Sequence, residues 1–239
     1  MKSNLLESIG LQNSIATKKY NFKYKNNRDK IGSDMKNFLA ESNLNPKIIF
    51  TAIQTHSNNV VDAKGGDDFI YGKIISNVDG LVTNDRDTAL VIKFADCTPV
   101  VLYDPIKKVQ ASVHSGWRGT STKISEIAIE KLISDYNSKR EDMYAFIGPS
   151  IDFNLYEVGS DVYDEFKHFK NRDIFFKRES ENKFKLNMKL ANEVLLLQNG
   201  ILKKHIEVSK ENTYSNLNLH SARRDGINYG LNAIVTLIK

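Results

Sequence analysis

Thr88–Gly119 limits the possible fold more than any other part of the chain, because three apolar runs follow one another within it. Leu90–Phe94, Pro99–Tyr103 and Val109–Val113 have the length and the residue types of buried strands. Asp104-Pro105, between the second and third runs, is typical of a tight reversal. We therefore predict that the second and third runs form a hairpin.

Elsewhere, strand-like and helix-like segments alternate irregularly, which favours a mixed sheet with helices outside it over a doubly wound parallel sheet. Helices are expected at Ile31–Glu41, Thr122–Tyr136, Tyr156–Phe169 and Met188–Gln198, and strands at Lys18–Lys25, Lys47–Ile53, Val60–Ala63, Met143–Ile147 and His205–Val208. Lys64–Asn77 is expected to be a loop, and Leu231–Ile238 suits a strand or a helix. No repeat or linker divides the chain, so we predict one domain over residues 1–239.

Composition narrows the class of protein. The chain has 34 basic and 29 acidic residues, but the lysines are scattered and no dense basic run lies beside stacking aromatics, so nucleic acid is not expected as a partner. A modest positive field suits small anions such as phosphate. One cysteine excludes an internal disulfide. No apolar run resembles a signal peptide or approaches the ~18 residues of a membrane helix. We expect a soluble, cytoplasmic protein without membrane contact, as a monomer or a weak homo-oligomer.

Three chemically versatile residues, His56, Cys97 and His114, each follow a strand-like run and lie among small polar residues. Two imidazoles and one thiolate would form a three-ligand zinc site with an open fourth position, the arrangement of catalytic zinc. Their spacing matches no short zinc-finger motif. Two other interpretations stay open at this point: Cys97 is a buried small hydrophobe beside ordinary histidines, or it is a nucleophile with His114 as its base.

Several further residues are candidates for binding anions or moving protons. Ser115–Gly119 forms a glycine-rich turn whose backbone N–H groups, with Arg118, suit an anion, although the turn could equally be structural. Arg28 and the Arg223-Arg224 pair are suited to clamping phosphate or carboxylate, although surface arginines are commoner. Asp79 and Asp96 are candidate acid/base or supporting carboxylates, and Tyr156–Gly159 could line a pocket.

Six segments together resemble one known family, the laccase-domain proteins. These were first called polyphenol oxidases and are now regarded as purine nucleoside phosphorylases with adenosine deaminase activity. The matching segments occur in the family's order and span residues 54–226, most of the chain: Gln54–Ser57, Asp79–Thr83, Ala95–Pro99, His114–Gly119, Ile147–Pro149 with Tyr156–Gly159, and Ser221–Gly226.

The resemblance implies an α/β (α+β) fold, a single-domain mixed β-sheet sandwich flanked by helices. It implies that His56, Cys97 and His114 bind Zn²⁺, with copper as a less favoured metal. The implied reactions are phosphorolysis of adenosine, inosine, guanosine and methylthioadenosine, and deamination of adenosine, with purine nucleosides and phosphate as partners. The catalytic candidates are Cys97, Asp96 and Arg223, and the candidates for binding substrate or phosphate are Arg28, Gln54, Arg118, Ser221 and Arg224.

Three other functions are considered beside this one. A copper polyphenol oxidase would need several copper ions and more than the five histidines of this chain. A hydrolase using Cys97 and His114 could act on a cell-wall precursor or another amide. A non-catalytic metal-binding protein would retain the metal ligands alone.

Overall fold

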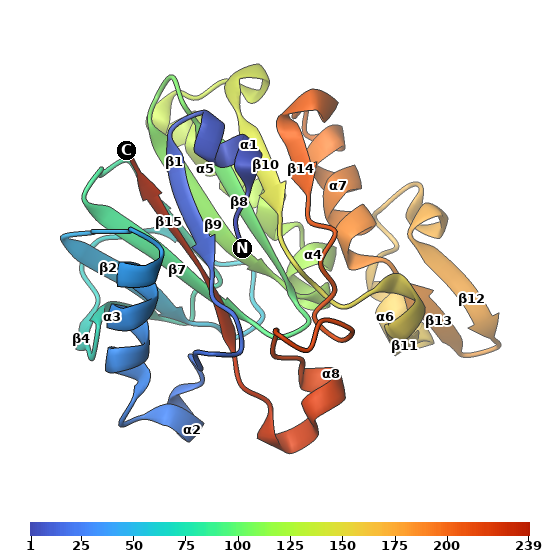
Figure 1. Ribbon diagram of the computed structural model, residues 1–239. Coiled ribbons are helices and arrows are strands. Elements are labelled where there is room, and N and C mark those ends of the chain that lie inside the picture. The colour runs from blue at the N-terminus through green and yellow to red at the C-terminus, as the bar shows by residue number, and fades with distance from the viewer.

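Two six-stranded β-sheets pack face to face at the centre of the computed structural model, which describes residues 1–239 (Figure 1). The first sheet has the strand order β1 (Leu11–Ile15), β15 (Asn232–Ile238), β7 (Thr88–Phe94), β2 (Ile48–Ile53), β5 (Gly72–Ser76) and β4 (Asp67–Phe69). The second has the order β14 (Ile206–Val208), β10 (Tyr144–Ile147), β8 (Thr98–Asp104), β9 (Val109–Ser115), β6 (Gly80–Thr83) and β3 (Val60–Asp62). Both sheets mix parallel and antiparallel pairs.

Alternation along the strands divides the apolar side chains between the two faces of each sheet. Ile92 and Phe94 of β7 belong to one buried cluster with Val101 and Tyr103 of β8, and this cluster fills the space between the sheets. Val91 of β7 belongs to a different cluster, on the outer face of the first sheet. One strand therefore supplies two separate cores.

Helices cover the outer face of each sheet. On the first sheet, α3 (Ile31–Glu41) buries Met35 and Phe38 against Val91. On the second sheet, α5 (Ile124–Tyr136) and α7 (Met188–Gln198) pack against strand residues such as Val100. The layers run helix, sheet, sheet, helix, which confirms the expected mixed sandwich flanked by helices.

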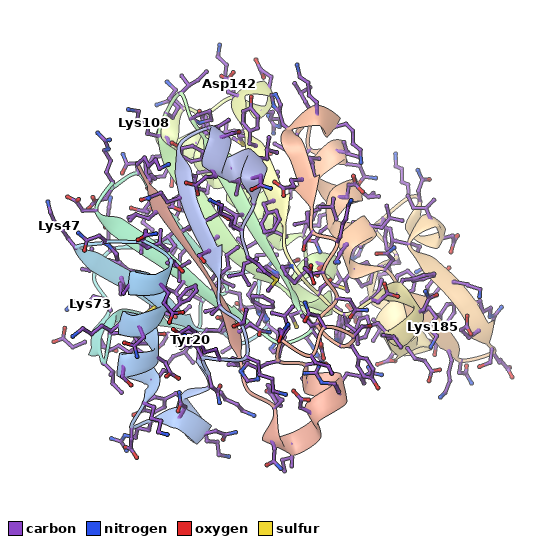
Figure 2. The ribbon with its side chains drawn as sticks, in the orientation of Figure 1. Tyr20, Lys47, Lys73, Lys108, Asp142 and Lys185 are labelled. Carbon is purple, nitrogen blue, oxygen red and sulfur yellow. The ribbon has the colours of Figure 1, made fainter.

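A smaller three-stranded sheet lies beside α7, at the right of Figure 1. It consists of β11 (Glu157–Gly159), β13 (Lys183–Leu186) and β12 (Phe176–Ser180) and packs with α6 (Ser160–Glu165) around an aromatic cluster. Figure 2 shows Lys185 on this sheet. The remaining helices are short: α1 (Asn4–Ser8), α2 (Tyr24–Asn27), α4 (Trp117–Ser121), α8 (Ala222–Asp225), and the 3-10 turns Arg140–Asp142, Phe153–Leu155, Arg172–Ile174, Lys203–His205 and Gly226–Asn228.

Several predicted elements are confirmed. β8 and β9 form the predicted hairpin, with Asp104 paired to Val109. α3 and α7 have the predicted bounds, and α5 begins two residues after the predicted start. The ambiguous segment at the end of the chain is strand β15, because it pairs on both sides, with β1 and β7, and is buried throughout.

Three predictions are wrong, each because distant parts of the chain decide the local structure. Lys18–Lys25 forms a turn and the start of α2 rather than a strand. Lys64–Asn77 contains β4 and β5, since β5 pairs with the distant β2 in parallel and β4 then pairs with β5. Tyr156–Phe169 is not one helix, because its first residues pair with β13 as β11 and α6 follows. None of the helices combines the length and apolar character needed to cross a membrane.

Candidate metal centre and cavity

His56, Cys97 and His114 come together at one edge of the two sheets. Cys97 lies in the crossover from β7 of the first sheet to β8 of the second, and His114 lies in β9, paired with Pro99. His56 follows β2 in a loop. The potential ligand atoms of the three residues all lie within 4.8 Å of one another. The structure therefore assembles the predicted triad from three separate strand ends.

Asp79, which precedes β6, organises two members of this triad. Its side chain is fully buried and accepts a hydrogen bond from His114 Nδ1 at 2.9 Å. It also accepts from the backbone N–H groups of His56 and Ser57, at 3.1 and 2.8 Å. Burial favours protonation of Asp79, but the bonds from His114 and Ser57 outweigh it and hold its pKa well below the usual range. The bond to Nδ1 leaves His114 Nε2 as the atom available to a metal.

The two histidines favour the thiolate form of Cys97. Burial raises the pKa of the Cys97 thiol, but the charge of His114 and hydrogen bonds from His114 and His56 outweigh it and lower this pKa to about 6. Cys97 Sγ lies 3.8 Å from His56 Nε2. A thiolate is the form of cysteine that binds metals, so the electrostatics of the triad suit a cation held between the sulfur and two imidazoles.

Asp96 ties the Cys97 crossover to the C-terminal segment. It adopts the left-handed conformation, with φ +81°, and its two carboxylate oxygens accept bonds from Thr213 Oγ1 at 2.6 Å and from the backbone N–H of Arg223 at 2.7 Å. Its backbone carbonyl accepts a bond from the N–H of Ile151 at 3.1 Å. Asp96, a predicted catalytic residue, therefore holds the backbone at Cys97 and Arg223 in position.

A cavity of about 970 Å³ opens beside the triad and is lined by 23 residues, 15 of them hydrophobic. It contains all three triad residues and four more predicted site residues, Gln54, Asp96, Arg118 and Arg223. Its walls come from segments far apart in the sequence, including α2, α4 and α8; α2 and α8 lie at the bottom of Figure 1.

Two arginines border the metal side of this cavity. The Arg118 guanidinium lies 4.1 Å from the centre of the Trp117 ring, and the Arg223 guanidinium lies 5.5 Å from the centre of the Tyr156 ring. Arg223 Nη2 also donates to the Glu157 carbonyl at 3.3 Å. Neither guanidinium is paired with a carboxylate, so both can offer donors to an anion in the cavity.

Three predicted binding residues lie outside the cavity lining. The Arg224 guanidinium donates to Asp225 and to the carbonyls of Tyr214 and Leu219, among others, so its donors are used within the protein. Ser221 Oγ accepts from the backbone N–H of Arg224 and caps α8. Arg28 is exposed beside the Tyr24 ring. The structure does not bring these three residues to the triad.

Gln54 lines the cavity, but its side-chain amide is engaged with the protein. It accepts from the backbone N–H of Lys93 at 2.9 Å and donates to the Lys93 carbonyl at 2.7 Å, as a neighbouring strand would. Lys93 and Trp117 are among the cavity residues that were not predicted as site residues. The available signal for Lys93 is its position as the one charge in the apolar run Thr88–Phe94.

Comparison with known proteins decides the family. The family described as multi-copper polyphenol oxidoreductase laccase matches residues 11–239. The chain belongs to this family. It is the laccase-domain family that the sequence motifs indicate, and the metal in the family's description accords with the His56–Cys97–His114 cluster, which could hold a metal ion.

Relatives within the laccase-domain family carry names of enzymes. The chain is 32% identical to the purine nucleoside phosphorylase YlmD of Bacillus subtilis, over 73% of this chain and 65% of that protein. It is 31% identical to a purine nucleoside phosphorylase of Bacteroides thetaiotaomicron, over 77% of this chain and 71% of that protein. It is also 32% identical to the adenosine deaminase RL5 of an unknown prokaryotic organism, over 65% of this chain and 60% of that protein. The match therefore spans somewhat less than two thirds of two of these relatives.

A solved structure has the same fold. The hypothetical protein YfiH of Bacillus licheniformis superposes with a TM-score of 0.81 at 29% identity, covering 87% of this chain and 81% of that chain. The names of the curated relatives support an enzyme in this family. The particular reaction has to be argued from the residues of the site.

Proposed function

We propose that residues 1–239 form one catalytic domain that phosphorolyses purine nucleosides and deaminates adenosine, in the cytoplasm and with zinc. The observation that carries the proposal is the convergence of His56, Cys97 and His114 on a cavity with two unpaired guanidinium groups. The substrates would be adenosine, inosine, guanosine and methylthioadenosine, with phosphate as the second substrate. The names of the B. subtilis relative and of RL5 support the two activities.

The donor set fits zinc. One thiolate and two imidazoles leave a fourth position open, as in catalytic zinc sites. The triad is the one cluster of metal-binding side chains of this kind in the structure, whereas a multi-copper oxidase holds several copper ions. Zinc bound by His56, Cys97 and His114 would lower the pKa of a coordinated water towards ~7 and so supply the nucleophile that deamination of a purine requires.

The arginines suit phosphorolysis. In that reaction a phosphate oxygen bonds to the sugar carbon C1′ while the bond from C1′ to purine N9 breaks. Arg118 and Arg223 face the same cavity as the triad and would hold the phosphate in position, with its charge balanced. Asp96 fixes the backbone of Arg223, which keeps that arginine at the cavity wall.

Tyr156 is suited to act as a hydrogen-bond donor to the purine as negative charge builds up on it. Burial is the main cause that raises the pKa of this phenol, and the charges of Cys97 and Asp96 raise it further. The phenol therefore stays protonated at neutral pH. A neutral donor in the cavity wall would stabilise a leaving base that gains negative charge.

Direct assay tests the proposal. The purified, zinc-loaded protein is incubated with inosine and phosphate, and separately with adenosine alone, and the products are separated by chromatography. Hypoxanthine with ribose 1-phosphate, and inosine with ammonia, are the expected products. The matched variant Cys97→Ser should lose both activities together with its zinc. Absence of both reactions from fully zinc-loaded protein would refute the proposal.

A second candidate rests on the low pKa of Cys97. A cysteine that is ionised at neutral pH and lies beside two histidines could serve as the nucleophile of a hydrolase. Alkylation separates the two functions. A zinc-bound thiolate should resist iodoacetamide until a chelator is added, whereas a catalytic thiolate without metal should react at once.

A further inference from the structure

Lys93 is a cation of the cavity wall that the proposed reaction does not use. It belongs to β7, four residues before Cys97, in an otherwise apolar run. Its ammonium group donates one hydrogen bond, to the carbonyl of Ala52 at 2.9 Å, and has no carboxylate partner. An ammonium group carries three donors, so two remain for a ligand. Burial lowers the pKa of Lys93 to about 8, and no neighbouring negative charge opposes this effect.

The position of Lys93 is fixed relative to the metal triad. The Gln54 side chain bonds to both the N–H and the carbonyl of Lys93, and Gln54 lies two residues before His56. β7 itself continues directly to Cys97. Lys93 and the triad therefore line one cavity, and β7 and the hydrogen bonds of Gln54 connect them.

Apolar and aromatic residues form much of the cavity wall: Phe22, Tyr24, Phe69, Ile74, Tyr229 and Leu231. Phe22, Phe69 and Leu231 pack in the outer-face cluster with Ala233, the strand partner of Lys93. The Tyr24 and Phe69 rings lie 5.6 Å apart. A partly buried ammonium group in such surroundings attracts an anion more strongly than a surface lysine does.

The charges that line the whole cavity are unbalanced. Four cations line it, Lys25, Lys93, Arg118 and Arg223, against the single carboxylate of Asp96. Both oxygens of that carboxylate are already bonded, to Thr213 and to the backbone of Arg223. A ligand that fills the cavity would therefore complement it best with negative charge at two places, beside the arginines and beside Lys93.

We propose that Lys93 forms a second anion-binding subsite and that this protein binds purine nucleosides carrying an anionic group on the sugar. This inference rests on the proposed function, since it places a purine nucleoside in the cavity. The aromatic walls would hold the uncharged part of the ligand. A phosphate ester and a carboxylate share the required chemistry, and the experiment distinguishes them.

Calorimetry with three probes tests the subsite: inosine, inosine 5′-monophosphate and inosine 5′-carboxylate, each added to zinc-loaded protein without inorganic phosphate. At least one anionic probe should bind about tenfold more tightly than inosine, as expected for one charge-assisted hydrogen bond. The probe that shows the preference identifies the anion. Equal affinity of the wild-type protein for all three probes would overturn the inference.

Variants assign the preference to Lys93. Lys93→Met should abolish the preference for the anionic probe, and Lys93→Arg should retain most of it. Lys107→Met removes the same charge from the exposed β8–β9 turn, outside the cavity lining, and should bind all three probes as the wild type does. Figure 2 shows the neighbouring Lys108 at the end of the fold opposite α8. A preference that survives in Lys93→Met would overturn the inference, and thermal unfolding checks that this variant is folded; Lys93→Gln replaces it if it is not.

Two further results separate this inference from related ones. If Lys93→Met loses affinity for inorganic phosphate while Arg223→Met retains it, the co-substrate phosphate occupies the subsite and the nucleoside anion does not. Turnover of inosine is assayed separately. An intact binding preference without any turnover would refute the proposed reaction but support the subsite, and turnover without a preference would do the reverse.

Discussion

Asp79 and His114 form a buried pair in which the imidazole Nδ1 donates to the carboxylate at 2.9 Å. The same carboxylate accepts three backbone N–H groups of the loop that carries His56. One buried charge therefore orients two of the three proposed metal ligands, although Asp79 does not belong to the cluster itself.

Asp79→Asn is expected to weaken zinc binding by about 10- to 100-fold, the usual effect of losing the group that orients a histidine ligand. An amide cannot accept all of these bonds with the strength of a carboxylate, and its NH₂ group would face donors. Competition with a chromogenic chelator measures the affinity. Asp142→Asn, a half-buried change in the Arg140–Asp142 turn at the top of the molecule in Figure 2, is the matched control. Equal zinc affinity of the two variants would show that Asp79 has no such role.

Gly116→Ala is expected to disturb the metal site while leaving most of the fold intact. A Cβ atom on Gly116 would lie 3.0 Å from Cys97 Sγ and 3.1 Å from His56 Cδ2, closer than ordinary contacts. Because His56 is exposed, its ring can move away, so the triad should yield before the core does. We expect zinc affinity to fall at least tenfold with a change in unfolding free energy below about 1 kcal/mol. A large loss of stability with unchanged zinc affinity would contradict this reading of the turn.

The apolar runs before His56, Cys97 and His114 made these residues candidates, because strand ends are visible in the sequence, and the resemblance to the laccase-domain family then selected them as metal ligands. The sequence did not predict which arginine side chains donate hydrogen bonds within the protein and which remain available to a ligand. Arg223 and Arg224 are adjacent and chemically identical, yet one faces the cavity and the other bonds to distant carbonyls. Likewise β4 and β5 depend on pairing that begins at β2, which no local pattern in Lys64–Asn77 reveals.

The two arginines give a direct test of this division of roles. Arg224→Met should destabilise the protein by about 2–3 kcal/mol, because it leaves carbonyls of Tyr214 and Leu219 without their donor and breaks the pair with Asp225. Arg223→Met should change stability by less than about 1 kcal/mol and weaken phosphate binding. Denaturant unfolding and phosphate calorimetry on both variants provide the comparison. The reverse pattern would exchange the two roles.

The burial of Lys93 should make the free energy of unfolding depend on pH. In the folded protein the pKa of Lys93 is lowered to about 8 from its ordinary value of 10.5, so between these values the unfolded chain binds more protons and stability rises with pH. The full shift corresponds to about 3 kcal/mol of unfolding free energy.

Lys93→Met should therefore be more stable than the wild type at pH 7, by about 2 kcal/mol once the lost bond to Ala52 is subtracted. This advantage should shrink as the pH rises from 8 towards 10.5. Denaturant unfolding of wild type, Lys93→Met and Lys107→Met at pH 7 and pH 10 measures it, and an advantage that stays constant with pH would show that Lys93 is not titrating in this window.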